Sequence, residues 1–412
     1  MTREMDVRSL EDLAFIAQRT PHILTLFSGG LDSSYLLYQL SKLDCKVTAL
    51  AVDLGEGADY AELARITNFF GATLKVVDGR SAFVEDAVLP AIQAHAQYLG
   101  QYPISSSLSR PIIARFAVAA AHRLGCGALL HTANQSQNSL RRLNGAIKQL
   151  GYTGFTGSPY EYSALSREEK IAELNEAGLC GFQSRGMSGD ANLWVREYES
   201  GCLDNPENFS VSEDIYSWTR AHQARDHDQL EIEFREGRPF ALNRQILPLI
   251  ELIHQVNHLA GSFQIGRYSG LEHLEGGEKV LEVREAPAAA VLLLAYRTLE
   301  TAVLDAELIR EKIAIEQLWV REAIEGRWFG ALHGAASAFV AATAKAVSGK
   351  VTLQLSQGCA QLAAIKAPSA LYLTDRDGWE KAIARERGSR TLAEQHTRRS
   401  VRSGVLAEGV NP

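Results

Sequence analysis

The stretch that decides the fold is LTLFSGGLDSSYLLYQL, residues 24–40, in which a short apolar run leads into a glycine turn and then a helical pattern. Gly29 and Gly30 let the backbone turn tightly, so that successive N–H groups point inward. Ser28 and Ser33 add hydroxyl donors, and the helix that begins near Ser33 adds the positive end of its dipole. The stretch therefore predicts an anion-binding loop of a size suited to pyrophosphate.

Asp32 lies inside this loop, where a carboxylate would repel a bare phosphate. Its presence indicates a cation rather than a partner in the core, and the Mg²⁺ that accompanies ATP fits best, bound directly or through water. The loop matches neither G-x-x-x-x-G-K-[ST] nor G-x-G-x-x-G. The alternative is a plain strand-to-helix turn in which Asp or Ser caps the helix. Its position after an apolar strand favours phosphate binding.

Outward from this loop, compact apolar runs alternate with helical patterns. We predict strands at 23–27, 46–52, 73–77 and 128–131, and helices at 33–42, 60–70, 87–98 and 111–124. Strands that are apolar throughout, rather than alternating, are typical of a parallel sheet in an α/β domain. Ligands bind such sheets at the carboxyl ends of the strands, so the loops after Phe27, Val52 and His131 should face one crevice.

The character of the sequence changes after Tyr152, where a segment rich in Gly, Ser and Tyr precedes a charged helix and a long loop region. The alternating segment 228–242 predicts a hairpin, and helical patterns follow at 246–260 and 288–324. These elements indicate an α+β second domain. Beyond Gly378, an Arg-rich segment has too few large apolar residues to form a core. We therefore expect two domains and a C-terminal tail, at residues 1–165, 166–378 and 379–412.

The composition is that of an ordinary globular protein, with 46% hydrophobic and 22% charged residues in 412. The net charge of −7 argues against nucleic acid as a partner. The five cysteines are scattered, which argues against a disulfide framework and fits a reducing cytoplasm. The longest apolar run, 286–296, is too short for a membrane span. His254 and His258 have a zinc-compatible spacing, but without a third ligand in view a polar helix face is favoured.

The segment SGGLDSS at residues 28–34 is similar to the PP-loop motif of ATP pyrophosphatases, which cleave ATP between the α and β phosphates. The segments QYPISSSLSRPIIAR, MSGDANLWVREYESGCLDNPENF, LEIEFREGRP and HGAASAFV resemble segments of argininosuccinate synthases, in the same order and at similar spacing. The resemblance spans residues 23–373. It implies a parallel-sheet PP-loop domain of the adenine nucleotide alpha hydrolase type, followed by an α+β synthetase domain.

Members of that family activate the ureido oxygen of citrulline with ATP, release pyrophosphate and let the amine of aspartate displace AMP. Adenylation turns a poor leaving group into a good one, and holding the reactants in line removes much of the entropic barrier. The resemblance thus implies a C–N ligase that uses ATP and Mg²⁺ and takes small amino-acid substrates. It also implies a homotetramer in which the tail reaches neighbouring subunits.

The resemblance also implies a set of site residues. Asp32 and Ser33 are the candidates for catalysis. The ATP set is Leu26, Phe27, Ser28, Gly29, Gly30, Asp32, Ser33, Ser34, Val52, His131 and Thr132. The amino-acid set is Tyr102, Ser106, Ser107, Arg110, Asn134, Asn138, Ser139, Arg142, Ser188, Glu197, Glu199, Glu272 and Arg284. Because an α-carboxylate requires a group such as guanidinium, we expect Arg142 to bind the carboxylate of the activated substrate.

Several of these positions depart from the family pattern. Glu197 stands where the family has Ser, and Arg284 where it has Tyr. The segment HTANQSQNS, residues 131–139, differs from the family's HGATGKGND, since Gly, Thr, Lys and Asp are replaced by Thr132, Asn134, Ser136 and Ser139. A buried site tolerates unpaired charges poorly, so losing an acid and a lysine favours a change of the amine partner, the ureido or amide partner, or both. The alternative, an ordinary housekeeping synthase, is disfavoured but stays open.

Two other interpretations stay open. Another PP-loop adenylating enzyme, such as a tRNA thiolase, usually has a catalytic cysteine pair and a basic RNA surface, and neither is evident in this sequence. A nucleotide-binding pseudoenzyme would keep the ATP loop without turnover, and the altered segment 131–139 leaves room for it. Pyrophosphate release with a panel of amino acids would separate the ligase from both.

Overall fold

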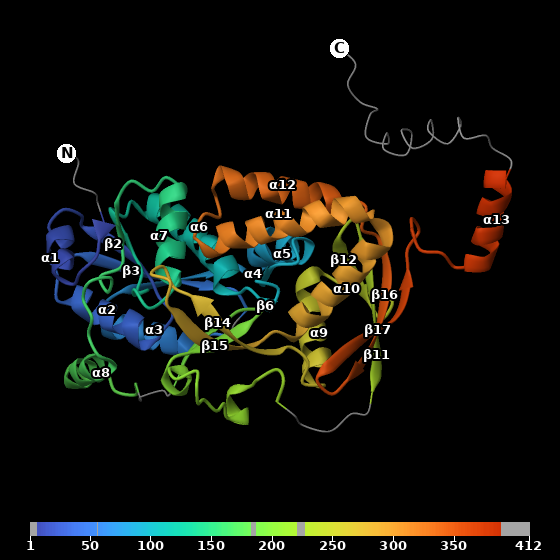
Figure 1. Ribbon diagram of the computed structural model, residues 1–412. Helices are drawn as coiled ribbons and strands as arrows, with labels where there is room; N and C mark the ends of the chain where they lie inside the picture. Colours follow the sequence, from blue (N-terminus) through green and yellow to red (C-terminus); the bar gives the residue numbers. More distant parts are fainter. Residues whose placement is uncertain (1–5, 56, 183–186, 221–226, 389–412) are drawn as a thin grey trace, which may run out of the picture. The chain divides into compact units, whose positions relative to one another are not determined.

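The first half of the chain forms a parallel sheet with the strand order β1-β8-β7-β2-β3-β4 (Figure 1). The computed structural model describes residues 6–55, 57–182, 187–220 and 227–388. The strands are β1 (Asp6–Val7), β2 (His22–Leu26), β3 (Lys46–Asp53), β4 (Thr73–Asp78), β7 (Ala128–Leu130) and β8 (Phe155–Gly157). Since β2 pairs with both β3 and β7 in parallel, the loops after these three strands leave the same edge of the sheet. The predicted parallel α/β sheet is confirmed.

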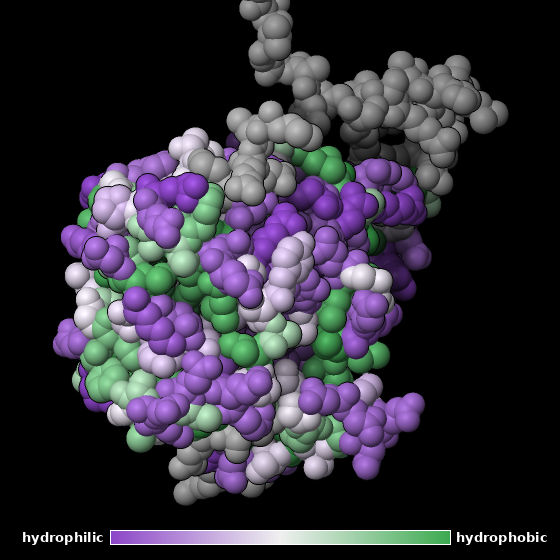
Figure 2. All heavy atoms as spheres, turned by 90° about the vertical axis from the view of Figure 1, so that its left-hand side faces the viewer, coloured by the Kyte–Doolittle hydropathy of each residue, from purple (hydrophilic) through white to green (hydrophobic). Residues whose placement is uncertain are grey.

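Helices cover both faces of this sheet. Because neighbouring residues of a strand point to opposite sides, they pack into different cores. Ile23 belongs to a core with α1 (Glu11–Ala17), α2 (Leu31–Ser41), α3 (Tyr60–Phe69) and α8 (Arg167–Glu176). Leu24 belongs to a core with α6 (Ser106–Leu124) and α7 (Ser139–Gln149). On the end of the molecule that Figure 2 shows, the side of the parallel sheet, hydrophilic residues are interspersed with hydrophobic areas.

In the first half, two of the predicted helices have clearly different bounds. The helix expected at 87–98 is wrong at both ends, since the helical segment comprises α4 (Arg80–Phe83), a π-helical turn (Val84–Val88) and α5 (Leu89–Gln93). The chain then turns at His95, where φ is +46°. It continues into a small hairpin formed by β5 (Gln97–Tyr98) and β6 (Tyr102–Pro103). Helix α6 begins five residues before the expected start at Pro111, and so carries Ser106, Ser107 and Arg110.

The second half is built on two antiparallel sheets. One has the order β14-β15-β10-β9, and the other β13-β12-β11-β16-β17. Their strands are β9 (Ser188–Ala191), β10 (Arg196–Glu199), β11 (Asp228–Arg235), β12 (Arg238–Leu242), β13 (Gln245–Ile246), β14 (Arg267–His273), β15 (Lys279–Glu285), β16 (Gly349–Ser356) and β17 (Cys359–Lys366). The hairpin predicted at 228–242 is confirmed as β11 and β12.

Helices α9 (Leu249–Gly261), α10 (Pro287–Val303), α11 (Ala306–Ile324) and α12 (Ala331–Ala344) pack with these sheets into a large apolar core. Helix α9 starts after Pro248 rather than at Ile246, because Ile246 pairs in β13. The pattern at 288–324 is interrupted, since the chain leaves α10 at Leu304 and Asp305 caps α11. Figure 1 shows α11 and α12 lying side by side.

The contacts within the chain define one unit at residues 1–369 and another at 370–412. In the second unit, α13 (Arg376–Gly388) is helical, in line with the helical potential of the predicted tail. Leu371, Leu373 and Trp379 are exposed in this unit. Residues 389–412 of the predicted tail lie outside the described residues. Among the helices that the structure describes, none combines the length and apolar character needed to cross a membrane.

Candidate active site

The loop between β2 and α2 has the tight geometry that its glycines and serines predict. Gly29 has φ +75°, and a Cβ there would lie 2.5 Å from Leu63 Cδ2, so that glycine is required. Ser33 Oγ donates to the carbonyl of Gly30 at 3.1 Å, and Ser28 Oγ lies 3.3 Å from Ser33 Oγ. Helix α2 starts at Leu31, so its first N–H groups have no acceptor inside the helix. These groups are suited to phosphate oxygens.

Asp32 has a protein partner that the sequence did not reveal. Its Oδ1 accepts a hydrogen bond from Lys170 Nζ at 2.8 Å, across 138 residues of chain. Lys170 also lies 4.4 Å from the centre of the Tyr160 ring, and the Tyr160 hydroxyl donates to the backbone carbonyl of Asp32 at 2.9 Å. The expectation that Asp32 has no core partner is therefore wrong, since α8 brings a buried lysine to it.

The loop after β7 lies beside this loop, because β7 and β2 are neighbouring parallel strands. His131 is buried, and its Nε2 lies 2.8 Å from Asn144 Oδ1. Burial lowers the pKa of His131 to about 4, so the ring is neutral at pH 7. Asn134 Oδ1 accepts from the backbone N–H and the hydroxyl of Ser136 at 3.0 and 2.7 Å. Asn134 therefore stabilises its own loop, and Thr132 is half-buried next to His131.

Five of the predicted amino-acid residues lie on one face of the sheet β14-β15-β10-β9. Glu197 is paired with Arg284 on one side and with Asp190 on the other, and side chains directly opposite one another point the same way. Alternation along the strands adds Ser188, Glu199, Glu272 and Glu282 to this face. The sheet thus presents a charged face to α6 and α7, which carry Arg110 and Arg142.

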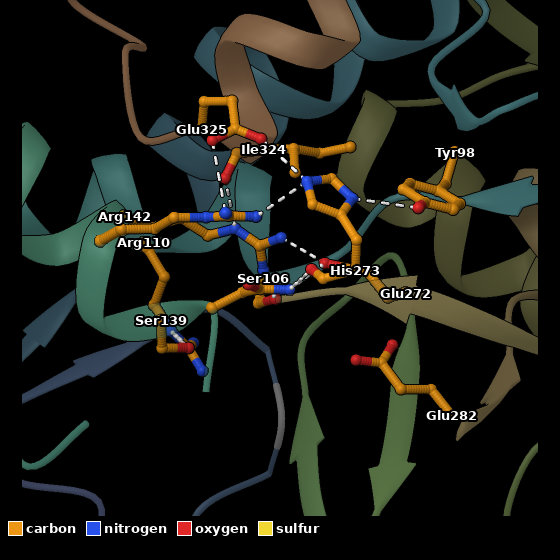
Figure 3. Close-up of polar contacts among 12 residues, drawn as sticks. Tyr98, Ser106, Arg110, Ser139, Arg142, Glu272, His273, Glu282, Ile324 and Glu325 are labelled. Carbon is orange, nitrogen blue, oxygen red and sulfur yellow. Dashed lines mark hydrogen bonds and ion pairs between the residues drawn. The ribbon is translucent and has the colours of Figure 1, made fainter. Parts of the chain in front are cut away.

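Arg142 and Glu272 form the buried centre of this site (Figure 3). Besides its ion pair with Glu272 Oε1, Arg142 donates to Ser106 Oγ at 2.6 Å and to the carbonyl of Ile324 at 3.1 Å. Asn138 Nδ2 donates to Glu272 Oε1 at 2.8 Å. Burial alone would raise the pKa of Glu272, but the guanidinium groups of Arg142 and Arg284 outweigh it and lower that pKa to about 2.

Arg284 joins three carboxylates on the sheet. It contacts Glu272 Oε2 at 2.8 Å, forms an ion pair with Glu282, and lies 3.3 Å from Glu197 Oε2. Burial raises the pKa of Glu197 and of Glu282 well above the usual range, although Arg284 acts in the opposite direction. The two departures noted in the sequence, Arg284 and Glu197, are therefore in contact with each other.

The aromatic side of the site is formed by Tyr102, Tyr98 and His273. Arg284 lies 4.5 Å from the centre of the Tyr102 ring, which stacks on Tyr98 at 5.3 Å. A Cβ at Gly270 would lie 2.4 Å from Tyr102 Cε1, so glycine lets the ring lie against β14. The Tyr98 hydroxyl lies 3.0 Å from His273 Nδ1, and His273 Nε2 lies 2.9 Å from Glu325 Oε1 (Figure 3).

The more accessible part of the site centres on Arg110. Its guanidinium pairs with Asp190 at 2.6 Å and donates from Nε to Ser139 Oγ at 3.0 Å. Glu199 Oε1 accepts from Gln137 Nε2 at 3.2 Å, and burial raises the pKa of Glu199. Ser188 is exposed at the start of β9, whereas Ser107 is buried in the first turn of α6.

The structure thus brings the predicted residues into two groups. The glycine loop and the start of the 131–139 loop share one edge of the parallel sheet. Arg142, Glu272 and Arg284 form a connected ion cluster with Glu197 and Glu282, and Ser106 and Asn138 donate or accept hydrogen bonds at its buried centre. In the described residues, the hydrogen bonds and ion pairs of Asp32 lead to α8 and Tyr160 rather than to this cluster. Sequence reasoning missed Lys170, Tyr160, Asp190 and Glu282. Strand alternation around Arg284 would have revealed Glu282 alone.

Comparison with known proteins covers both halves of the chain. Residues 22–179 match the model described as "Arginosuccinate synthase N-terminal HUP domain", and residues 187–390 match "Arginosuccinate synthase C-terminal domain". An argininosuccinate synthase of Rubrobacter xylanophilus is 34% identical over 86% of this chain and 87% of its own length. One of Oceanobacillus iheyensis is 34% identical over 88% of both chains.

Among solved structures, an NH3-dependent NAD synthetase from Campylobacter jejuni covers 41% of this chain and 72% of its own, with 18% identity and a TM-score of 0.28. That similarity is too weak to support a conclusion about function. The family models and the relatives, by contrast, cover most of the chain. The chain belongs to the argininosuccinate synthase family of ligases that form C–N bonds.

Proposed function

We propose that the protein adenylates a ureido or amide oxygen with ATP, releases pyrophosphate and joins the activated carbon to an amine, with substrates that differ from citrulline and aspartate. The observation that supports the ATP step best is the loop around Gly29, where a glycine with positive φ, the serine hydroxyls and the start of α2 converge at the edge of the sheet. Such a loop fits the β and γ phosphates that leave as pyrophosphate. Small-molecule partners and a cytoplasmic location belong to the same proposal.

This loop offers Mg²⁺ one protein carboxylate, and the nucleotide phosphates would supply further ligands. Mg²⁺ commonly binds one or two carboxylates together with substrate phosphates, and Asp32 supplies one partly exposed carboxylate. The described residues contain no group of three or more His, Cys, Asp or Glu side chains arranged for a metal ion. Asp32 would therefore hold the ion jointly with the nucleotide. When bound, Mg²⁺ supplies charge stabilisation for the phosphates.

The amino-acid site supports a change of substrate. Arg142 and Glu272, the expected partners of an α-carboxylate and an α-ammonium, are already bound to each other and nearly inaccessible, at 2 and 3% side-chain exposure. Arg284 and Glu197 add a further ion pair where the resemblance implies neutral Tyr and Ser. Around Arg110, the partly exposed carboxylates outnumber the guanidinium groups, which favours a substrate that presents an amine.

We therefore predict weak or absent formation of argininosuccinate from citrulline and aspartate. Arg284 and Glu197 form an ion pair where the resemblance implies neutral Tyr and Ser, and Ser139 accepts a hydrogen bond from Arg110 instead of offering a carboxylate to a substrate amine. Mass spectrometry of the products should find turnover far below an ordinary enzymatic rate of roughly 1 s⁻¹. The enzyme of Oceanobacillus iheyensis serves as the control. Synthesis at the control's rate would mean that the altered residues are tolerated variants.

We also propose a homotetramer in which the C-terminal segment docks on a neighbouring subunit. This segment, residues 379–412, begins with the exposed Trp379, and a short helix with so little apolar surface is marginal on its own. The Arg-rich tail has ample carboxylate partners on a chain with a net charge of −7.

Removing the residues after Gly378 should therefore lower the oligomer mass measured by light scattering at low micromolar concentration. A chain that ends after Gly388 keeps α13 but lacks the Arg-rich residues that follow, so comparing the two truncations separates the contribution of the helix from that of the tail. If the chain cut after Gly378 keeps the mass of the full-length protein, the segment is not an assembly arm.

A further inference from the structure

Lys170 is a buried cation whose side chain contacts Asp32, in the first turn of α2, and Tyr160. Its side chain is 8% exposed, its Nζ donates to Asp32 Oδ1 at 2.8 Å, and it lies over the Tyr160 ring. Lysine is seldom buried unless it is paired, and its partner here is itself inside the candidate phosphate loop. The ammonium group of Lys170 therefore lies within hydrogen-bond distance of Asp32, the one carboxylate of this loop.

The charges of the two loops show why a lysine beside Asp32 would affect phosphate binding. Residues 27–34 contain one acid and no base, and residues 131–140 contain neither lysine nor arginine. Left alone, Asp32 would repel a phosphate held by the N–H groups at the start of α2, since like charges a few ångströms apart interact strongly even at an effective dielectric constant of about 20. The ammonium group of Lys170 cancels that repulsion.

We propose that Lys170 is a positioning residue that fixes and neutralises the carboxylate of Asp32, so that the loop accepts pyrophosphate even without a metal ion. The proposal rests on the proposed function, because it assumes that this loop binds the phosphates of ATP. Lys170 thereby acquires a role in phosphate binding, although its helix, α8, lies outside the glycine loop between β2 and α2.

A purely structural role for Lys170 is the competing explanation, since α8 packs against α2. Other contacts already join these helices farther along α2. Gln39 Nε2 donates to Glu173 Oε2 at 3.4 Å, Lys42 Nζ lies 3.9 Å from the same oxygen, and Leu174 is buried in the shared core. Lys42→Met removes a lysine from the same helix interface but away from the loop, which makes it the matched control.

The test is the dissociation constant of inorganic pyrophosphate, measured by calorimetry in EDTA on the full-length protein. Lys170→Met should bind at least about tenfold more weakly than wild type, because Asp32 is then uncompensated. The double variant Lys170→Met/Asp32→Asn should recover to within about threefold of wild type, because both charges are gone. Lys42→Met should bind like wild type. Melting temperatures are recorded for all four proteins.

The outcomes separate the two proposals. If Lys170→Met lowers the melting temperature but binds pyrophosphate like wild type, or if the double variant fails to recover, Lys170 has only a structural role. If wild type itself binds no pyrophosphate, with or without Mg²⁺, the loop is not a phosphate site and the proposed function fails with it. Recovery in the double variant is a result that a structural role would not produce.

Discussion

Asp32→Asn should lower the rate of AMP and pyrophosphate formation by about a hundredfold or more, because the reaction loses the carboxylate that we propose holds Mg²⁺ against the phosphates. The fold should persist, since Asp32 is partly exposed and Asn retains the shape of the side chain. Lys170 would lose its partner, so a modest fall in the melting temperature is expected. The same substitution should strengthen pyrophosphate binding in EDTA, which separates catalysis from anion affinity.

The measurement is the steady-state release of pyrophosphate at saturating MgATP. Asp305→Asn is the control, because Asp305 also lies at the start of a helix, where its Oδ1 accepts from the N–H of Leu308 at 2.9 Å, and Asn can make the same cap. Near-normal turnover by Asp32→Asn would contradict the assignment of this carboxylate.

Arg142→Lys should raise the KM for the activated amino acid at least about tenfold and destabilise the protein by about 2–4 kcal/mol. A planar guanidinium reaches Glu272, Ser106 and the carbonyl of Ile324 at once, whereas one ammonium group cannot. Glu272 would then depend on Arg284 alone among the arginines it now contacts. Because Arg142 is buried and paired with Glu272, a substrate carboxylate would have to take over part of this pairing. Binding of the substrate carboxylate by Arg142 therefore stays a prediction, which the KM tests directly.

Arg141→Lys provides the comparison, because Arg141 is the next residue but pairs with Glu325 and His273. Its KM should stay close to that of wild type. An unchanged KM in Arg142→Lys, measured with whichever acid proves active, would show that Arg142 is part of the protein's own ion cluster and not a substrate ligand.

The strands and the glycine loop could be predicted because their causes are local. The apolar run before Phe27 predicts a buried strand. A glycine is needed at position 29 because φ is positive there and a Cβ would clash with Leu63. The helix expected at 87–98 failed for a reason that its sequence pattern conceals. The apolar positions continue past Ala94, but the backbone turns at His95 to pair β5 with β6.

The unpredicted parts of the site depend on contacts between distant segments. No local pattern distinguishes Lys170 from the other charged residues of its helix, because its partner lies 138 residues away. The ion pair of Glu197 and Arg284 follows from the register between β10 and β15, which the sequence does not specify. Considered one at a time, Glu197 and Arg284 each look like the loss of a family residue. Considered together, their opposite charges compensate one another.

The ligase assignment is tested most directly by incubating the full-length protein with MgATP and a panel of amino-acid pairs, and separating the nucleotide products by chromatography. We expect AMP and pyrophosphate in equal amounts with at least one pair that combines a ureido or amide acceptor with an amine. Formation of ADP, or no pyrophosphate with any pair while the nucleotide still binds, would contradict the ligase assignment and favour a nucleotide-binding pseudoenzyme.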